Sequence, residues 1–448
     1  MRESRYNVVV TRPDRVWVYN SLSGSTLSVS PEEWAGVEQF LSGAPGPTRP
    51  LETLRDLTVG RMLVNDDLDE LEVLERRFRA GTGDRTTFGL TIVTSLGCNF
   101  DCPYCFQVKP RAILDDETVG LLVEVLEEQL PNLRQFHVTW FGGEPLLATD
   151  RIDELSRAFI ERCDAAGVSY SASIVTNGYL LTPDVAQRLR EARVGDAQIT
   201  LDGPAETHDL MRPLRNGKGT FDVILDNVVA CADLIPISIR VNLDTANSEK
   251  YERLLDQLVE RGLAGRIGVY PGRIVAYDEG IGAPSETYRA ACFTLPAFAE
   301  IERDFLAAAR ERGLASARLP EPVQTPCTAT NVNDLVVGAS GELYKCWDSV
   351  GNEHEVIGHL RSWHDQNDRV LKWLRYDPFA DEGCRSCIAL PTCMGGCAHN
   401  QMTDPGDSKC STFRLTHRRQ VEEYVEAAEA VGGASGFLHA LLPVVAVT

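Results

Sequence analysis

Apolar and polar positions follow a regular rhythm from residue 89 onward. Short apolar runs rich in β-branched residues alternate with longer stretches in which apolar residues recur every three or four positions. The short runs predict buried strands, and the longer stretches predict amphipathic helices. Strands are expected at 89–95, 136–142, 172–178, 197–203, 237–243 and 266–272.

This alternation predicts a parallel sheet covered by helices, because a crossover helix is the usual link between parallel strands. Six repeats suit an incomplete barrel better than a closed one. The expected fold class is therefore α/β, with a partial (β/α)6 TIM-like barrel. Ligands of such sheets bind at the carboxyl ends of the strands, so candidate chemistry is expected there.

The first 86 residues have a different pattern. Short β-branched and aromatic runs at 6–10, 16–20 and 26–30 predict three strands, and helical patterns follow around a short strand at 62–64. This order of elements suggests a winged-helix-like module. An N-terminal addition without a binding role remains the alternative.

The alternation ends after residue 300. One helical pattern at 299–313 leads into a cysteine-rich region at 327–410, and a final helix is expected near 414–431. We therefore expect a recognition module, a core, a cysteine-rich domain and a C-terminal helix with a tail, at residues 1–86, 87–300, 301–412 and 413–448.

Composition narrows the class of protein. The chain has 448 residues, 43% of them hydrophobic, and a net charge of −21. An acidic surface repels phosphate backbones, so no nucleic-acid partner is expected. No uncharged apolar run approaches the length of about 18 residues typical of a membrane span, and the N-terminus lacks a secretory pattern. We expect a cytoplasmic protein with no membrane partner.

Thirteen cysteines are many for such a protein, and ten of them fall into two groups. In a reducing compartment, grouped thiols indicate metal binding or catalysis rather than disulfides. Cys98, Cys102 and Cys105 follow the first core strand with no fourth thiol nearby. Three thiolates on a four-iron cube leave one iron open to a small molecule, whereas structural zinc sites usually have a fourth ligand. From the residues alone, zinc or a disulfide stays an alternative.

The spacing C-x3-C-x2-C, with Tyr104 and Phe106 beside the last cysteine, resembles the radical S-adenosylmethionine (radical SAM) superfamily. The resemblance implies a barrel of the radical SAM type and a [4Fe–4S] cluster whose open iron binds S-adenosylmethionine. Reductive cleavage of this co-substrate would release a 5′-deoxyadenosyl radical that removes a substrate hydrogen atom.

Motifs at the following strand ends fit the same resemblance. The carboxylate of Glu144 suits the ammonium group of the methionine moiety, and the guanidinium of Arg212 suits the carboxylate of that moiety. Without a ligand-binding role, the glycine motif would form a turn, Arg212 would form a surface ion pair, and Asn242 would be a polar residue at a strand end. The resemblance implies contacts with S-adenosylmethionine for Tyr104, Phe106, Gly142, Gly143, Glu144, Asn177, Thr200, Arg212 and Asn242.

Seven further cysteines, with Gly341 before the second, match the SPASM extension of this superfamily. The resemblance implies two auxiliary [4Fe–4S] clusters, and thus three clusters in all. Cys384, Cys387, Cys393 and Cys410 would hold one, and Cys327, Cys346 and Cys397 would hold the other. Its fourth ligand would be Cys292, an aspartate, water or a substrate thiolate. Asp348 is the candidate acid–base residue, although it lies one position later than the aspartate of sulfatase maturases.

The N-terminal module resembles the leader-binding elements of peptide maturases. Our first interpretation is an enzyme that installs an oxidative crosslink, either a thioether or a C–C or C–O bond, in a ribosomally synthesised precursor peptide. Its partners would be that peptide and an external electron donor such as flavodoxin or ferredoxin. The alternatives are a sulfatase-type maturase that forms formylglycine, a maturase of a peptide-derived cofactor, and a non-catalytic iron–sulfur protein.

Overall fold

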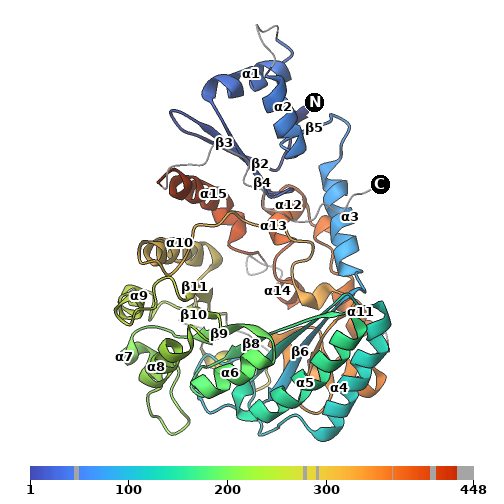
Figure 1. The fold of residues 1–448 in the computed structure, drawn as a ribbon, viewed down its shortest axis with the longest axis vertical. Coiled ribbons are helices and arrows are strands. Elements are labelled where there is room, and N and C mark those ends of the chain that lie inside the picture. The colour runs from blue at the N-terminus through green and yellow to red at the C-terminus, as the bar shows by residue number, and fades with distance from the viewer. Residues whose placement is uncertain (45–49, 276–279, 289–291, 366, 404–409, 431–448) are drawn as a thin grey trace. The chain divides into compact units, whose positions relative to one another are not determined.

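The computed structural model describes residues 1–44, 50–275, 280–288, 292–365, 367–403 and 410–430. The chain divides into two compact units made of non-consecutive segments (Figure 1). Unit 1 contains Met1–Thr82, Ala317–Pro326 and Asp377–Thr448, and unit 2 contains Gly83–Ser316 and Cys327–Tyr376.

The unit boundaries differ from the domain boundaries predicted near 300 and 412. The chain leaves unit 1 after Thr82 and returns to it twice, so packing groups segments that are distant in sequence. The predicted cysteine-rich domain is therefore divided between the two units. The division into four domains that the sequence suggests stays a prediction. Residues 431–448, in the C-terminal tail of that division, lie outside the described residues.

Unit 2 is built on one sheet with strand order β11-β10-β9-β8-β7-β6-β12-β13-β14. All six strands expected from the apolar runs are present and pair in parallel, which confirms the α/β class with a central parallel sheet. They are β6 (Thr87–Ser95), β7 (Gln135–Gly142), β8 (Ser169–Thr176), β9 (Val194–Thr200), β10 (Ile237–Leu243) and β11 (Gly268–Arg273).

Three strands of this sheet were not predicted. β12 (Asp334–Val337) extends the parallel sheet beside β6, and β13 (Glu342–Tyr344) and β14 (Gly358–His359) follow in antiparallel pairing. These strands have only four, three and two residues, which is too short for a periodic pattern to be recognised.

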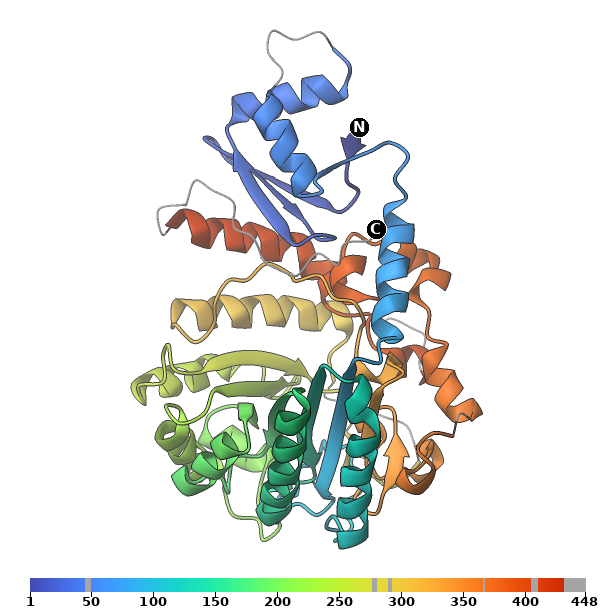
Figure 2. The same cartoon turned by 45° about the vertical axis from the view of Figure 1, so that its right-hand side comes forward.

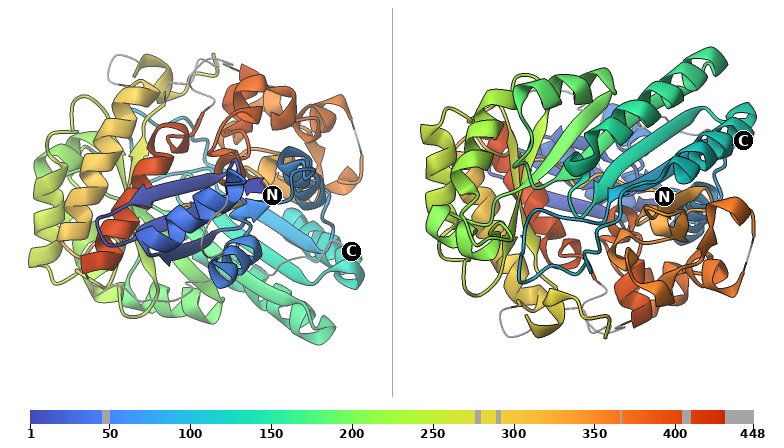
Figure 3. Two further views of the ribbon diagram at one scale, coloured as in Figure 1. Left: turned by 90° about the horizontal axis from the view of Figure 1, so that it is seen from above. Right: turned by 90° about the horizontal axis from the view of Figure 1, so that it is seen from below.

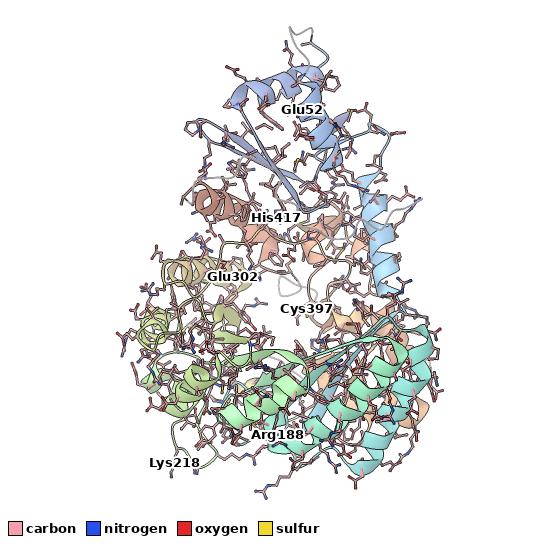
Figure 4. The ribbon with its side chains drawn as sticks, in the orientation of Figure 1. Glu52, Arg188, Lys218, Glu302, Cys397 and His417 are labelled. Atoms are coloured by element: carbon pink, nitrogen blue, oxygen red, sulfur yellow. The ribbon has the colours of Figure 1, made fainter. Side chains whose placement is uncertain are left out.

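Helices cover one face of the sheet, as the view from below in Figure 3 shows for α4 and α5. Asp115 and Thr182 begin two of the helices by accepting hydrogen bonds from backbone N–H groups three residues on. On the outer surface, Arg188 (labelled in Figure 4) forms an ion pair with Asp150 and Asp153. The helices are α4 (Asp116–Gln129), α5 (Thr149–Ala166), α6 (Pro183–Glu191), α7 (Ala205–Met211), α8 (Phe221–Cys231), α9 (Tyr251–Glu260), α10 (Leu295–Glu311) and α11 (Asp368–Leu374).

The two faces of the sheet differ in polarity because side chains alternate along each strand. On β7, Phe136 packs against other buried aromatic rings under the helices. The neighbouring positions His137 and Thr139 point the other way and hydrogen-bond to Ser171 and Ser173 of β8. The inner face of the sheet is therefore lined with hydroxyl groups and a half-buried imidazole.

Unit 1 is built around an antiparallel sheet of β2 (Asn7–Thr11), β3 (Val16–Asn20) and β4 (Ser25–Val29). The predicted strands and helices of the N-terminal region are all present. The other predicted elements are α1 (Pro31–Leu41), α2 (Leu51–Val59), α3 (Glu70–Thr82) and β5 (Leu63–Val64). The short strand β1 (Arg2–Glu3), which pairs with β5, was not predicted.

Apolar side chains cover both faces of this three-stranded sheet. On one face, Val18 and Leu27 pack with Trp34 of α1 and Leu57 of α2. On the other face, Val8 and its neighbours pack against α15 (Phe413–Ala430), which runs along the sheet in Figure 2. The C-terminal segment of unit 1 also forms α12 (Glu382–Arg385), α13 (Leu390–Cys393) and α14 (Ala398–Thr403). None of the helices in the described ranges is long and apolar enough to cross a membrane.

Candidate active site

The first group of cysteines lies in the loop that follows β6. Cys98 and Cys102 are buried and Cys105 is half-buried. The Phe100 N–H donates to the Cys98 Sγ at 3.3 Å. Burial raises the pKa of Cys102 to about 11 and also raises that of Cys98. Thiolates in this loop therefore need a compensating cation, as a cluster iron would provide.

A second segment fastens this loop from the side. The Asp101 N–H donates to the Pro213 carbonyl at 2.9 Å, and the Arg215 N–H donates to the Asn99 carbonyl at 3.0 Å. The segment after α7 thus pairs with the chain between the first two cysteines. Sequence reasoning identified Arg212 but missed this pairing, because backbone contacts leave no mark on residue type.

Gly142 and Gly143 lie where the end of β7 touches the base of the cysteine loop. A Cβ on Gly143 would lie 2.5 Å from the Leu96 carbonyl oxygen and 2.6 Å from that of Gly97. A Cβ on Gly142 would lie 2.1 Å from the Ser95 carbonyl oxygen. The close approach that requires these glycines is thus between two backbone segments of the protein, and it sets the position of the cysteine loop.

Glu144 is fully buried and accepts three hydrogen bonds. Its Oε1 accepts from the Thr176 hydroxyl at 2.6 Å and the Leu146 N–H at 3.0 Å. Its Oε2 accepts from the Asn177 N–H at 2.7 Å. Burial raises the pKa of Glu144, and these donors oppose the rise. The carboxylate therefore joins the ends of β7 and β8, and its contact with a methionine ammonium stays a prediction.

Asn177 continues this connection to the cysteine loop. Its Nδ2 donates to the Asn99 Oδ1 at 2.7 Å and lies 4.0 Å from the Cys98 Sγ. Its backbone is held by Glu144. The predicted residues of β7, β8 and the cysteine loop thus form one continuous set of contacts.

A second buried carboxylate, Asp202, organises the other side of the loop. It accepts a hydrogen bond from the Tyr104 hydroxyl, and its Oδ1 accepts from the Asn242 N–H at 2.9 Å. Arg212 donates to the Tyr104 oxygen at 2.6 Å and lies 3.9 Å from Asp202. Three predicted residues, Tyr104, Arg212 and Asn242, therefore meet at Asp202, which was not predicted as a site residue.

The charge of Arg212 is compatible with binding an anion. Burial alone would lower its pKa, but the Tyr104 oxygen, Cys102 and Asp202 hold that pKa above its usual value. Its Nε is buried and has no hydrogen-bond partner among the described residues. A buried N–H donor without an acceptor costs free energy unless a ligand accepts its hydrogen bond, and a carboxylate is a suitable acceptor. The residues therefore fit the methionine end of S-adenosylmethionine.

The remaining predicted residues of unit 2 surround this centre. Thr200 is buried at the end of β9. Phe106 packs with Phe141 beside the cysteine loop. Trp347, which follows Cys346, stacks on Phe141 with ring centroids 5.6 Å apart. Asp348 is in the same short helix as Trp347, and its acid–base role stays a prediction.

Four of the C-terminal cysteines share one cavity in unit 1. Its volume is about 100 Å³, and Leu390, Asp381 and Arg414 contribute to its wall. The Asp381 carboxylate accepts from the Cys384 N–H at 2.9 Å. Arg414 donates to the Cys410 Sγ at 3.5 Å. Soft donors around one cavity fit an iron–sulfur cluster. The thiols that line the cavity are those of Cys384, Cys387, Cys393 and Cys410.

The backbone around this cavity is folded to approach sulfur closely. Met394, Gly395 and Gly396 have φ values of 48°, 91° and 82°, so three successive residues are left-handed. This turn lets the Gly395 N–H, together with the Ser411 N–H, donate to the Cys393 sulfur. Burial still raises the pKa of Cys393, while these N–H groups stabilise its thiolate form.

The three other C-terminal cysteines are divided between the units. Cys327 and Cys346 are in unit 2 and Cys397 (labelled in Figure 4) is in unit 1. The Asn400 N–H donates to the Cys397 Sγ at 3.5 Å. Their binding of a common cluster stays a prediction. Within the described ranges, no three His, Cys, Asp or Glu side chains converge on a single metal ion. A four-iron cube does not require such convergence, because each thiolate binds a different iron.

Comparison with known proteins identifies the class of the core. Residues 92–258 match the sequence model of the Radical SAM superfamily. Residues 92–258 of the chain therefore form a radical SAM domain. Mycofactocin maturase MftC of Mycolicibacterium smegmatis is 28% identical over 332 residues, which cover 69% of this chain and 77% of that protein.

Two solved structures share the fold. Native anSMEcpe with bound AdoMet and Cp18Cys peptide has a TM-score of 0.55 at 18% identity and covers 77% of this chain and 97% of its own. Streptococcus suis SuiB bound to precursor peptide SuiA has a TM-score of 0.52 at 14% identity and covers 92% of this chain and 99% of its own. At these identities the likeness shows the fold.

Gly143→Ala is expected to displace the cysteine loop, because the added methyl group would lie against two carbonyl oxygens. We expect iron bound by this loop to be lost and affinity for S-adenosylmethionine to fall, measured by iron analysis and equilibrium binding. Gly120→Ala is the matched control, since nothing lies within 4 Å of its added Cβ on α4. Unchanged iron content and affinity in Gly143→Ala would contradict the contact.

Asp202→Asn is expected to weaken S-adenosylmethionine binding about tenfold or more while the cluster is retained. The change removes the charge that orients Tyr104 and Arg212, and hydrogen bonds to charged groups contribute about 1.5–3 kcal/mol each. Isothermal titration on iron-replete protein measures the effect. Asp196→Asn is the control, because Asp196 is a half-buried carboxylate on β9 that accepts a hydrogen bond from Ser238 instead. Equal affinities in both variants would exclude this role for Asp202.

Proposed function

We propose that this enzyme installs an oxidative crosslink, either a thioether or a C–C or C–O bond, in a ribosomally synthesised precursor peptide. The observation that carries the proposal is that one compact body, unit 1, contains both the N-terminal module with its three-stranded sheet and the four-cysteine cavity. Similarity to a maturase, and a shared fold with SuiB bound to its precursor peptide, give it further support.

The cysteine loop of unit 2 would hold a [4Fe–4S] cluster with S-adenosylmethionine on its open iron. When bound, this pair supplies a 5′-deoxyadenosyl radical that removes one hydrogen atom from the peptide. Arg212 would bind the methionine carboxylate through its free Nε. Tyr104 and Asn242 would be held in place by Asp202. The hydroxyl-lined inner face of the sheet offers polar partners to the peptide backbone.

Formation of the crosslink removes two hydrogens from the peptide. One leaves as an atom, and the other leaves as a proton whose electron must be accepted elsewhere. We propose Asp348 as the base for this proton. The cavity thiols Cys384, Cys387, Cys393 and Cys410 would hold the auxiliary cluster that accepts the electron. Cys327, Cys346 and Cys397 would serve a second auxiliary cluster, and flavodoxin or ferredoxin would supply the electron that begins each cycle.

The winged-helix-like module of unit 1 would bind the leader of the precursor as an added strand. The sheet has two outer strands, β2 and β4. On β2, the outward Val9 carbonyl already accepts from Arg418 of α15 at 3.1 Å. This contact partly closes the β2 edge. We therefore assign leader binding to the edge of β4.

The antiparallel register indicates which β4 residues face outward. Because the Val9 carbonyl points away from β3, the Val9–Val18 pair is a non-hydrogen-bonded pair, and the pattern alternates from there. Val18 then bonds to Leu27, so Thr26 and Ser28 direct their N–H and C=O groups away from β3. Thr26 is buried, whereas Ser28 is half-buried and is therefore the accessible position on this edge. The backbone groups of Ser28 are expected to pair with the leader.

The function is tested by co-expression with any short peptide found to be encoded beside this gene, followed by mass spectrometry. We expect a mass lower by two hydrogen atoms per crosslink, and fragment ions that locate the bond. Conversion of a single cysteine or serine to formylglycine would establish the sulfatase-type alternative instead. An unmodified peptide with fully iron-loaded enzyme would contradict the proposal.

Ser28→Pro is expected to weaken leader binding at least about tenfold, since proline removes the backbone donor at the open edge. Fluorescence anisotropy with a labelled leader peptide measures the change. Ser28→Ala is the matched control, because it also loses the side-chain contact with Arg15 but keeps the N–H. Equal binding by the two variants, both folded and iron-loaded, would show that this edge is not used.

A further inference from the structure

Tyr6, at the start of the three-stranded sheet, has a hydroxyl group without a protein partner. The residue is fully buried, and its oxygen has no hydrogen bond among the described residues. Buried hydroxyl groups in proteins are almost always paired, so such an atom needs an explanation. An acceptor that comes within reach only when a ligand binds beside Tyr6 would provide one.

Contacts on both sides place Tyr6 beside the loop that carries Cys384 and Cys387. The preceding residue, Arg5, donates to the Arg385 carbonyl at 2.6 Å. The Ser21 N–H donates to the Tyr6 carbonyl at 3.0 Å, and the Ser21 hydroxyl donates to the Ile388 carbonyl at 3.2 Å. Figure 1 shows α12 and α13 next to the three-stranded sheet in this unit. The neighbours of Tyr6 therefore contact Arg385 and Ile388, which flank Cys387 in the sequence.

The charged neighbours of Tyr6 leave one acceptor. Burial is the main cause that raises the pKa of Tyr6 to about 12. Negative charge on Glu70, Asp69 and Cys387 also raises this pKa, and Arg5 opposes the rise. The hydroxyl group therefore stays protonated and is able to donate.

Both carboxylates in this set already have other donors. Glu70 accepts from Arg2, from the Ser4 hydroxyl and from the Arg5 N–H. Asp69 accepts from the N–H groups of Leu71 and Glu72 at the start of α3. Arg5 has no acceptor to offer. The sulfur of Cys387 is the neighbour that remains.

We infer that the Tyr6 hydroxyl donates a hydrogen bond to the Cys387 sulfur, or to an inorganic sulfide beside it, when the cavity holds an auxiliary cluster. This inference rests on the proposed function, because it requires a cluster bound by the cavity thiols. A hydrogen bond to cluster sulfur stabilises the reduced, more negative state and so raises the reduction potential. Tyr6 is thus a positioning residue that makes this cluster a better electron acceptor.

The test is a potentiometric titration of the iron-loaded holoenzyme followed by electron paramagnetic resonance. Tyr6→Phe is expected to shift the midpoint of one cluster signal to a more negative potential and to remove one exchangeable proton coupling from that signal. Tyr19→Phe is the matched control: Tyr19 is also buried in unit 1, but its hydroxyl donates to the Pro320 carbonyl. In that variant all signals are expected to keep their potentials.

Two further outcomes distinguish failure of the Tyr6 hydrogen bond from failure of the auxiliary-cluster assignment. Unchanged potentials and proton couplings in Tyr6→Phe, with full iron content, would overturn the hydrogen bond and leave the cluster assignment intact. Cys387→Ser provides the second check, since it should abolish or alter the shifted signal. If Cys387→Ser leaves the iron content and every signal unchanged, the cavity holds no cluster, and both the inference and the auxiliary-cluster assignment fail.

Discussion

The site depends on two fully buried carboxylates that hold the ends of neighbouring strands against one cysteine loop. Glu144 joins β7 to β8, and Asp202 joins β9 to β10 and to Tyr104. Neither carboxylate is reached by solvent, so each depends on its hydrogen-bond donors for stability. Each hydrogen bond to such a charged group contributes about 1.5–3 kcal/mol. These contributions make the geometry of the loop rigid before any ligand arrives.

Unit 1 shows how distant parts of the sequence are combined for one purpose. Its three-stranded sheet packs on α15 through one face, and residues near its first strand contact the loop of Cys384 and Cys387. The module to which we assign leader binding and the cavity proposed to hold an electron-accepting cluster therefore share one folded body. In this account substrate recognition and electron removal are physically adjacent, whereas hydrogen abstraction belongs to unit 2.

Much of the fold could be predicted from the sequence, since β-branched runs mark strands that are buried on the helix-covered side. The boundary of β8 was predicted too late because its first residues, Ser169 to Ser171, are polar on alternate positions. The motif cysteines and Arg212 were also predictable. Asp202 was missed because its importance comes from partners 40 and 98 positions away in sequence. The steric need for Gly143 was likewise visible only once the loop backbone was placed.

The central claim is that Cys98, Cys102 and Cys105 leave one iron open for S-adenosylmethionine. The most direct measurement is the yield of 5′-deoxyadenosine after anaerobic, iron-loaded protein is mixed with dithionite and S-adenosylmethionine. We expect 5′-deoxyadenosine to form in wild-type protein and to be absent when the three cysteines are replaced by alanine. No product from the iron-loaded wild-type protein, or equal product from the alanine variant, would contradict the account.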